Sequence, residues 1–301
     1  MWDKHNGGFY TLVTKLGDPI LNEGVVKTAY GNSFAIYGLA TYFGASGDKE
    51  ALALAKKTFY WLEEHSHDPV YKGYFDAMGR NGKVLTRTEE TPSTSAIGYK
   101  DQNSSIHLLE SLTSLYQVWP DPLVRERLNE LMLLIRDRIT TDKGYLTLYL
   151  QPDWTPLSFA DQSREEINKH YYLDHVSFGH DVETAYLMLE ASEALGLKND
   201  TITLQKGKKM VDHALNYGWD NKLGGFYDGG YYFNGDNKLT IVNSDKNWWS
   251  QAEGLNTLLL MSDYYPNDSN NYRKHFDTLW EYTQTYLMDP KFGGWYEWGL
   301  D

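Results

Sequence analysis

The chain has 301 residues, 41% of them hydrophobic, so one large repeat-built domain fits it better than two unrelated domains. Its formal net charge of -13 argues against a nucleic-acid or anionic-membrane partner. It has no cysteine, which excludes disulfides, a thiolate nucleophile and a Cys-ligated metal. No stretch approaches the roughly 18 apolar residues of a membrane helix, and no basic-then-apolar signal opens the chain, so we expect a cytoplasmic protein.

A short turn motif recurs along the chain. It consists of an aspartate, four further residues, a glycine and an aromatic residue. Aspartate can bond its own backbone and glycine tolerates a positive φ, so the motif predicts a tight turn whose ring packs on helix ends. Its copies are Asp3…Gly8-Phe9, Asp68…Gly73-Tyr74, a shorter form Asp142-Lys-Gly144-Tyr145, Asp220…Gly225-Phe226 and Asp289…Gly294-Trp295.

Apolar periodicity between the turns predicts about eight helices paired into four hairpins. Closed toroids of such hairpins commonly have six, and the chain begins inside one turn and stops just after another. We therefore expect an all-α toroid with about four of six hairpins, as a single incomplete domain over residues 1–301. The predicted helices span 26–43, 49–64, 102–119, 121–139, 180–195, 201–217, 248–264 and 271–288.

The longer connections fall at one end of the hairpins, where we expect them to roof a pocket. The Asn81-Gly82 and Asn234-Gly235 pairs predict two small β-hairpins. Residues 146–154 form a further irregular insertion.

Three polar segments each open an apolar helix, at intervals of roughly 70 residues. In a closed ring all three would point at one axis, and imidazoles, carboxylates and indoles converging on one pocket suggest sugar chemistry. Aromatic rings with a polar edge, of which the chain has 10 Trp and 24 Tyr, suit carbohydrate surfaces as well as cores. The segments are Asn103–Glu110, Gly179–Glu183 and Trp248–Glu253.

The second segment contains a candidate acid–base pair. His180 and Glu183 share one helix face, so the carboxylate can orient the imidazole or raise its basicity for proton transfer. The competing interpretation is a structural pair at a helix start.

The other segments contain candidate binding groups. Asn103 and His107 lie on one helical stripe and can hold sugar hydroxyls or a developing oxyanion, unless they form a buried polar cluster. Trp249 and Glu253 lie on one helix face, where the indole can stack on the C–H face of a pyranose and the carboxylate can bind its hydroxyls. The competing interpretation is that the adjacent tryptophans belong to the core. Further candidates are Tyr30, Trp248 and Gln251.

Other chemistries have weaker support. His107, His180 and the neighbouring glutamates lack a tight His-x-x-x-His pair, so no metal is predicted. The chain has neither a phosphate-binding Gly-x-x-x-x-Gly-Lys loop nor a Gly-x-Ser-x-Gly nucleophile elbow.

Taken in order, these segments resemble the N-acylglucosamine 2-epimerase family, which includes cellobiose 2-epimerases and mannose isomerases. The resemblance covers nearly the whole chain and implies an (α/α)6 barrel that needs no cofactor. It rests on Tyr30-Gly-Asn-Ser-Phe34-Ala-Ile-Tyr, Asn103-x-x-x-His107-Leu-Leu-Glu110, Gly179-His180-Asp-x-Glu183, Trp248-Trp249-x-Gln251-Ala-Glu253 and the late Gly-Gly-Trp295.

The resemblance also implies a mechanism. One histidine removes the proton at C2 of an opened sugar to give an enediolate, and a second returns a proton to the opposite face or to C1. His180 matches a family acid–base histidine and Glu183 its helper. His107 matches a histidine that contacts the sugar oxygens, Trp249 the stacking indole and Glu253 a pocket carboxylate.

Two family positions have no counterpart here: an arginine of the first inner helix, and a histidine in a late Trp-Lys-x-x-Tyr-His segment. We therefore expect a truncated chain that is weakly active or inactive alone. We also expect self-association, including a homodimer, through helix faces left exposed. A mono- or disaccharide is the expected partner. The alternatives are a glycoside hydrolase on the same barrel type, using Glu183, Glu253 or Asp228, and a non-catalytic sugar-binding remnant.

Overall fold

The computed structural model describes residues 1–21, 25–233 and 238–301. The chain divides into two compact units, and each is described by itself. The first unit contains residues 1–139, 148–157 and 190–198, and the second contains residues 140–147, 158–189 and 199–301. The single domain expected from the sequence stays a prediction.

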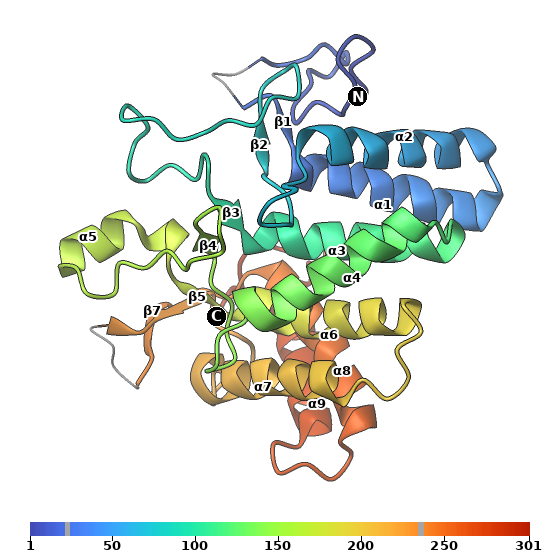
Figure 1. The fold of residues 1–301 in the computed structure, drawn as a ribbon. Coiled ribbons are helices and arrows are strands. Elements are labelled where there is room, and N and C mark those ends of the chain that lie inside the picture. The colour runs from blue at the N-terminus through green and yellow to red at the C-terminus, as the bar shows by residue number, and fades with distance from the viewer. Residues whose placement is uncertain (22–24, 234–237) are drawn as a thin grey trace. The chain divides into compact units, whose positions relative to one another are not determined.

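Long helices form most of the first unit (Figure 1). Helix α1 packs against both α2 and α3, and α3 packs against α4. Two short antiparallel strand pairs precede these helices. Strand β1, just before α1, pairs with β2, and strand β3, just before α3, pairs with β4. The elements are β1 (Lys27–Thr28), α1 (Ala29–Ser46), α2 (Lys49–His65), β2 (Ala77–Met78), β3 (Lys100–Asp101), α3 (Gln102–Val118), α4 (Pro122–Leu134), the π-helical η1 (Ile135–Ile139) and β4 (Tyr149–Leu150).

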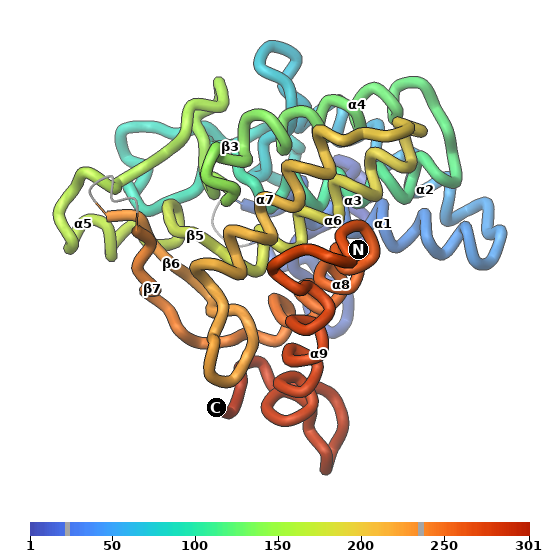
Figure 2. The backbone as a smooth tube through the Cα atoms, turned by 90° about the horizontal axis from the view of Figure 1, so that it is seen from below, coloured from blue at the N-terminus to red at the C-terminus, as the bar shows by residue number. Residues whose placement is uncertain are grey.

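The second unit is also mostly helical. Helix α8 packs against α9, and both lie together in the orange and red part of the trace in Figure 2. Strands β5, β6 and β7 form a small antiparallel sheet. The elements are α5 (Arg164–Lys169), the 3-10 helix η2 (Tyr171–Leu173), β5 (Val176–Ser177), α6 (Phe178–Ala194, with residues 178–189 in this unit), α7 (Thr201–Gly218), β6 (Gly229–Tyr231), β7 (Thr240–Asn243), α8 (Trp248–Tyr264), α9 (Tyr272–Tyr282) and the π-helical η4 (Thr283–Leu287).

The predicted helices are confirmed, with corrections at their ends and in the loops. Helix α1 begins only at Ala29, because Lys27 and Thr28 pair with β2. The Asn81-Gly82 hairpin is confirmed by the bridge between Met78 and Val84. The insertion at 146–154 was expected to be irregular, but it contains β4. The Asn234-Gly235 turn lies outside the described residues. No described helix is long and apolar enough to span a bilayer.

The predicted turn motif is confirmed in its four full copies. In each, aspartate Oδ1 accepts hydrogen bonds from the backbone N–H groups two and three residues later, and the fourth and fifth residues have positive φ. Glycine occupies these positions except at Lys72, whose φ of 69° is uncommon for a residue with a Cβ. The four aspartates are Asp3, Asp68, Asp220 and Asp289.

A buried lysine anchors three of these turns, a feature that the sequence interpretation missed. Each lysine lies two residues before a helix start and donates to the turn's aspartate. Lys100 is fully buried, with its Nζ 2.7 Å from Asp68 Oδ2, 2.6 Å from the Lys72 carbonyl oxygen and 4.7 Å from the Trp154 ring centroid. The lysines are Lys27, Lys100 and Lys246.

The fourth residue of a helix also ties down a turn. Asn32 accepts from the Phe9 N–H and donates to its carbonyl oxygen. Gln251 makes the same two bonds to Phe226, at 2.8 and 2.9 Å. Asp181 accepts from the Leu146 N–H at 2.9 Å. The position is therefore a polar clip between a helix and the aromatic turn.

Candidate active site

Several of the predicted site residues occupy equivalent helix positions. Helices α1, α3, α6 and α8 begin directly after Thr28, Asp101, Ser177 and Asn247. Positions 2 and 6 of a helix lie on one face, since they are four residues apart. Position 2 is Tyr30, Asn103, Gly179 and Trp249, and position 6 is Phe34, His107, Glu183 and Glu253.

In the first unit, α1 and α3 bring three rings together. The His107 ring centroid lies 5.2 Å from that of Tyr30 and 4.8 Å from that of Phe34. His107 Nδ1 lies 3.0 Å from Glu110 Oε2, which fixes the imidazole orientation. Tyr30, Phe34, His107 and Glu110 thus form one contact cluster at the starts of α1 and α3.

A cavity of about 480 Å³ lies beside this cluster, in the same unit. Tyr30 and Asn103 line it, together with Asp76, Asp101 and Tyr149. Burial and the negative charge of Asp101 raise the pKa of Asp76 to about 7. Burial also raises the pKa of Asp101, although hydrogen bonds from Ser104 oppose this shift. Two carboxyl groups of altered acidity therefore face a space next to the predicted binding residues.

Asp76 should make the stability of the protein depend on pH. Its pKa is raised in the folded state, so the folded chain holds a proton that the unfolded chain has lost between pH about 4 and 7. Stability should therefore fall across this interval and stay lower above it. We expect the free energy of unfolding of Asp76→Asn, minus that of wild type, to be larger at pH 8 than at pH 4. Urea unfolding at the two pH values measures this difference. The control is Asp18→Asn, an exposed carboxylate; equal pH profiles for Asp76→Asn and wild type would contradict the prediction.

In the second unit, α6 and α8 bring His180 and Trp249 together. Their ring centroids lie 4.7 Å apart at 51°, so the indole packs against the imidazole. His180 Nδ1 lies 2.7 Å from Ser177 Oγ. In the tautomer with its proton on Nδ1, the imidazole donates to this hydroxyl and carries its lone pair on Nε2. Glu183, the predicted helper, is buried on the same helix.

Gly179 permits the close approach of α6 and α8 at this point. A Cβ added to it would lie 2.0 Å from Ser250 Oγ and 2.7 Å from Trp249 Cη2. Gly179→Ala should therefore displace Trp249 and destabilise the protein by about 1–3 kcal/mol, the usual cost of overpacking. Thermal unfolding measures the loss. Gly38→Ala is the matched control, because an added Cβ meets nothing within 4 Å; equal melting temperatures for the two variants would refute the steric argument.

The remaining predicted residues of α8 have different surroundings. Glu253 Oε2 accepts a hydrogen bond from the Tyr186 hydroxyl at 2.8 Å. The Trp248 side chain is 46% exposed, and its ring lies 6.4 Å from that of Trp295. Gln251 is fully buried and both ends of its amide are used by Phe226, so its contacts are those of a structural clip. The structure thus groups Trp249 with His180, whereas Gln251 bonds to Phe226 and to the Asn247 carbonyl oxygen.

Asp228, considered above as a hydrolytic acid, is held by two amides. Asn243 Nδ2 donates to its Oδ2 at 2.9 Å, and Asn247 Nδ2 donates to its Oδ1. Burial raises its pKa. Since Asn247 also caps α8, these contacts tie β7 and a helix start together.

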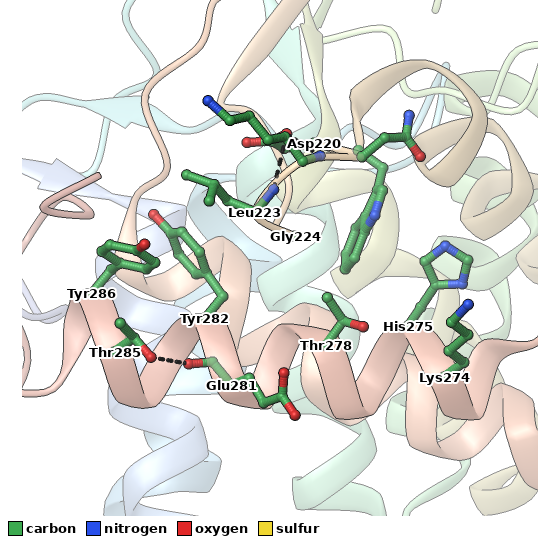
Figure 3. Close-up of a pocket in the computed structure, with 13 residues that line it drawn as sticks. Asp220, Leu223, Gly224, Lys274, His275, Thr278, Glu281, Tyr282, Thr285 and Tyr286 are labelled. Carbon is green, nitrogen blue, oxygen red and sulfur yellow. Dashed lines mark hydrogen bonds between the residues drawn. The ribbon is translucent and has the colours of Figure 1, made fainter.

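A second cavity, of about 440 Å³, lies along α9 in the second unit (Figure 3). The turn at Asp220 and Gly224 forms one side, and Thr278, Tyr282 and Tyr286 point into it from the other. It contains none of the predicted site residues, so it is separate from the candidate site.

The sequence interpretation missed Ser177, Asp76 and Tyr149. Ser177 was detectable in principle, because a serine three residues before a helical histidine can reach its ring. Asp76 lies in a loop and Tyr149 in the two-residue strand β4, and neither segment is long enough for periodicity to mark a side chain that faces a cavity. Across the described ranges, no group of three or more His, Asp or Glu side chains is arranged to hold a metal ion.

Comparison with known proteins identifies the family. A family model described as N-acylglucosamine 2-epimerase (GlcNAc 2-epimerase) matches residues 1–298. A cellobiose 2-epimerase of Bacteroides fragilis is 29% identical over 99% of this chain and 69% of its own length. A D-mannose isomerase of Marinomonas mediterranea is 26% identical over 97% of this chain and 67% of its own.

A solved structure extends the likeness to the fold. Cellobiose 2-epimerase from Spirochaeta thermophila matches with a TM-score of 0.79 and 27% identity, covering 99% of this chain and 67% of that one. The predicted all-α fold of the (α/α)6 type, with small sheets, is thereby confirmed, while the number of hairpins is not tested. The chain belongs to the N-acylglucosamine 2-epimerase family, a family of carbohydrate epimerases and isomerases.

Proposed function

We propose that this chain is a sugar 2-epimerase or aldose–ketose isomerase that acts at C1 and C2 of a reducing sugar. The geometry of His180 carries the proposal. Its Nδ1 is 2.7 Å from Ser177 Oγ, and an indole 4.7 Å away offers a flat apolar face beside the base. A fixed imidazole next to a stacking surface suits proton abstraction from a bound sugar.

The proposed reaction begins with the open-chain aldose. His180 takes the proton from C2, the C1–C2 double bond forms, and the aldehyde oxygen becomes the anionic oxygen of an enediolate. A proton returned to the opposite face of C2 re-forms the aldehyde and gives the epimer. A proton returned to C1, together with transfer of the O2 hydroxyl proton to O1, forms the C2 carbonyl and gives the ketose. Epimerisation therefore needs a second acid on the other face, whereas the imidazolium of His180 itself can serve for isomerisation.

The other residues have supporting tasks in this proposal. Glu183, three residues after His180, assists the base, and Trp249 stacks on the C–H face of the sugar. Glu253 accepts a hydrogen bond from a sugar hydroxyl. In the first unit, His107 and Asn103 hold the oxygens on the reacting carbons, a role supported by the ordered imidazole beside a polar cavity. Hydrogen-bond donors at a developing enediolate oxygen lower the barrier to its formation.

Hydrogen exchange in D2O tests the proposal. The protein is incubated with mannose, N-acetylmannosamine or cellobiose, and the C2 proton is followed by NMR. We expect deuterium at C2 of at least one sugar, together with its epimer or ketose. Release of glucose from cellobiose without exchange would instead support a hydrolase, and binding without either would support a sugar-binding remnant.

A further inference from the structure

We propose that the cavity along α9 in the second unit is a separate, non-catalytic saccharide site that binds one neutral hexose unit. His180 and Trp249 do not line this cavity, so a sugar held there is not the one that reacts. Binding at this site is independent of the proposed reaction.

The repeated turns show how the space beside such a turn is closed in the first unit. In both turns of that unit an indole covers a turn glycine and donates its N–H to the backbone carbonyl three residues after the aspartate. The nitrogen-to-oxygen distances are 2.9 and 2.7 Å. One tryptophan thus fills the space and satisfies the carbonyl. The residues are Trp61 over Gly8 with the Asn6 carbonyl, and Trp154 over Gly73 with the Tyr71 carbonyl.

The turn at Asp220 in the second unit lacks this indole. Two smaller side chains of α9, Thr278 and Tyr282, lie against its glycines instead. The Tyr282 hydroxyl points away from the turn and donates to Asp301 at 2.6 Å. The described residues therefore provide no donor to the Leu223 carbonyl oxygen, and a cavity of about 440 Å³ stays open beside it.

The cavity lining combines aromatic faces with polar atoms that are not yet used. Tyr282 and Tyr286 point into it from α9 with their ring centroids 5.1 Å apart, and Trp219 adds a third ring (Figure 3). The Thr278 hydroxyl has no hydrogen-bond partner in the part of the chain that the structure describes. His275 donates from Nδ1 to a backbone carbonyl, which leaves its Nε2 as an acceptor. Aromatic faces pack on the C–H groups of a pyranose, and its hydroxyls can bond to these polar atoms.

The charges of the lining favour a neutral ligand. Two lysines, Lys222 and Lys274, and two carboxylates, Asp220 and Glu281, line the cavity, so their formal charges sum to zero. Neither an anion nor a cation gains from such a balance. The volume of about 440 Å³ lies within the range of pockets that hold small molecules. A neutral hexose unit meets these conditions of size, charge and hydrogen bonding.

The first unit also supplies a template for closing this cavity. Trp61 faces its anchoring lysine, with Lys27 Nζ 5.3 Å from the ring centroid. Tyr282 faces the equivalent lysine, with Lys246 Nζ 4.5 Å from its ring centroid. The two rings therefore occupy equivalent places. Tyr282→Trp should put an indole over the turn, with its N–H on the Leu223 carbonyl oxygen, and fill the cavity.

A glycoside that cannot react tests the site. Methyl β-D-glucopyranoside is titrated into the chain, and the backbone amide signals of Gly224 and Thr278 are followed by two-dimensional NMR. We expect saturable shifts at tens of millimolar in wild type, and none in Tyr282→Trp. Thr278→Val keeps the shape of the side chain but removes the hydroxyl, and should weaken binding several-fold. Tyr264→Trp, the same exchange at an exposed tyrosine of α8, should bind like wild type. Thermal unfolding verifies that each variant folds.

The outcomes separate this site from the proposed reaction. No saturable shift of Gly224 and Thr278 in wild type, or equal shifts in Tyr282→Trp and Tyr264→Trp, would overturn the site even if C2 exchange occurs. Tighter binding of glucose 6-phosphate than of the glycoside would show an anion site and overturn the assignment to a neutral hexose. Shifts that Tyr282→Trp abolishes, in protein that exchanges C2 of no sugar, would keep the site and remove the epimerase.

Discussion

His180→Ala should lower the rate of C2 exchange by about 10³-fold or more in protein that shows the exchange. General base catalysis contributes roughly 10² to 10⁴ to a rate. The measurement is the loss of the C2 proton signal in D2O. Imidazole added to the variant should restore part of the rate, because the missing group is a base.

Two controls separate this effect from a loss of structure. His5→Ala removes an exposed imidazole from the first unit and should leave the rate unchanged. Ser177→Ala removes the hydroxyl 2.7 Å from His180 Nδ1 and should cost about tenfold, since the ring stays but loses its fixed orientation. Retained exchange in a folded His180→Ala protein would remove His180 as the base.

Lys100→Met should destabilise the protein by about 3–5 kcal/mol, the range for breaking a buried ion pair by removing one partner. The Asp68 side chain is 8% exposed and would keep its charge with no cation beside it. Hydrogen bonds from Lys100 and from the Val70 and Tyr71 N–H groups hold the pKa of Asp68 low against the effect of burial, so the carboxylate stays ionised at neutral pH. Urea unfolding at pH 7 measures the loss.

Asp68→Asn added to Lys100→Met should recover part of this stability, because the amide is neutral and its oxygen can still accept from the turn. The exposed pair Arg273 and Asp277, 3.1 Å apart, is the matched control. Arg273→Met should cost less than about 1 kcal/mol. A similar cost for both single variants would show that burial of the Lys100 pair contributes nothing.

The helices and turns were predictable because each is encoded locally. Asp68 and Gly73 lie within one turn, and the apolar period of a helix extends over a few residues. The buried link between Lys100 and Asp68 was not predictable in this way, because it joins positions 32 residues apart. A lysine ordinarily indicates a surface, and only its recurrence two residues before three helix starts marks it as a core residue.

The candidate site shows the same limit. Trp249 was predictable from helix position, since α8 places it on the face that packs on α6. Gln251 shares the segment, but two positions further on the helix has turned its side chain into the protein, where it bonds to Phe226. The position of Asp76 in the cavity could not be predicted from the sequence, because it depends on how one loop folds over the ends of two helices.

The lysine anchors have an evolutionary consequence. Each one clamps the two ends of a connecting segment, and the clamped positions are 24, 32 and 26 residues apart in the three copies. Outside the residues that bond to a helix, such as Phe9, Asp76 and Phe226, the length and sequence between the clamps can therefore vary while the helix starts stay anchored. The second of these segments supplies Asp76, Ile97 and Tyr99 to the cavity of the first unit. Residues of this segment that line the cavity can thus change, and the ligand preference with them, while the helices keep their structure.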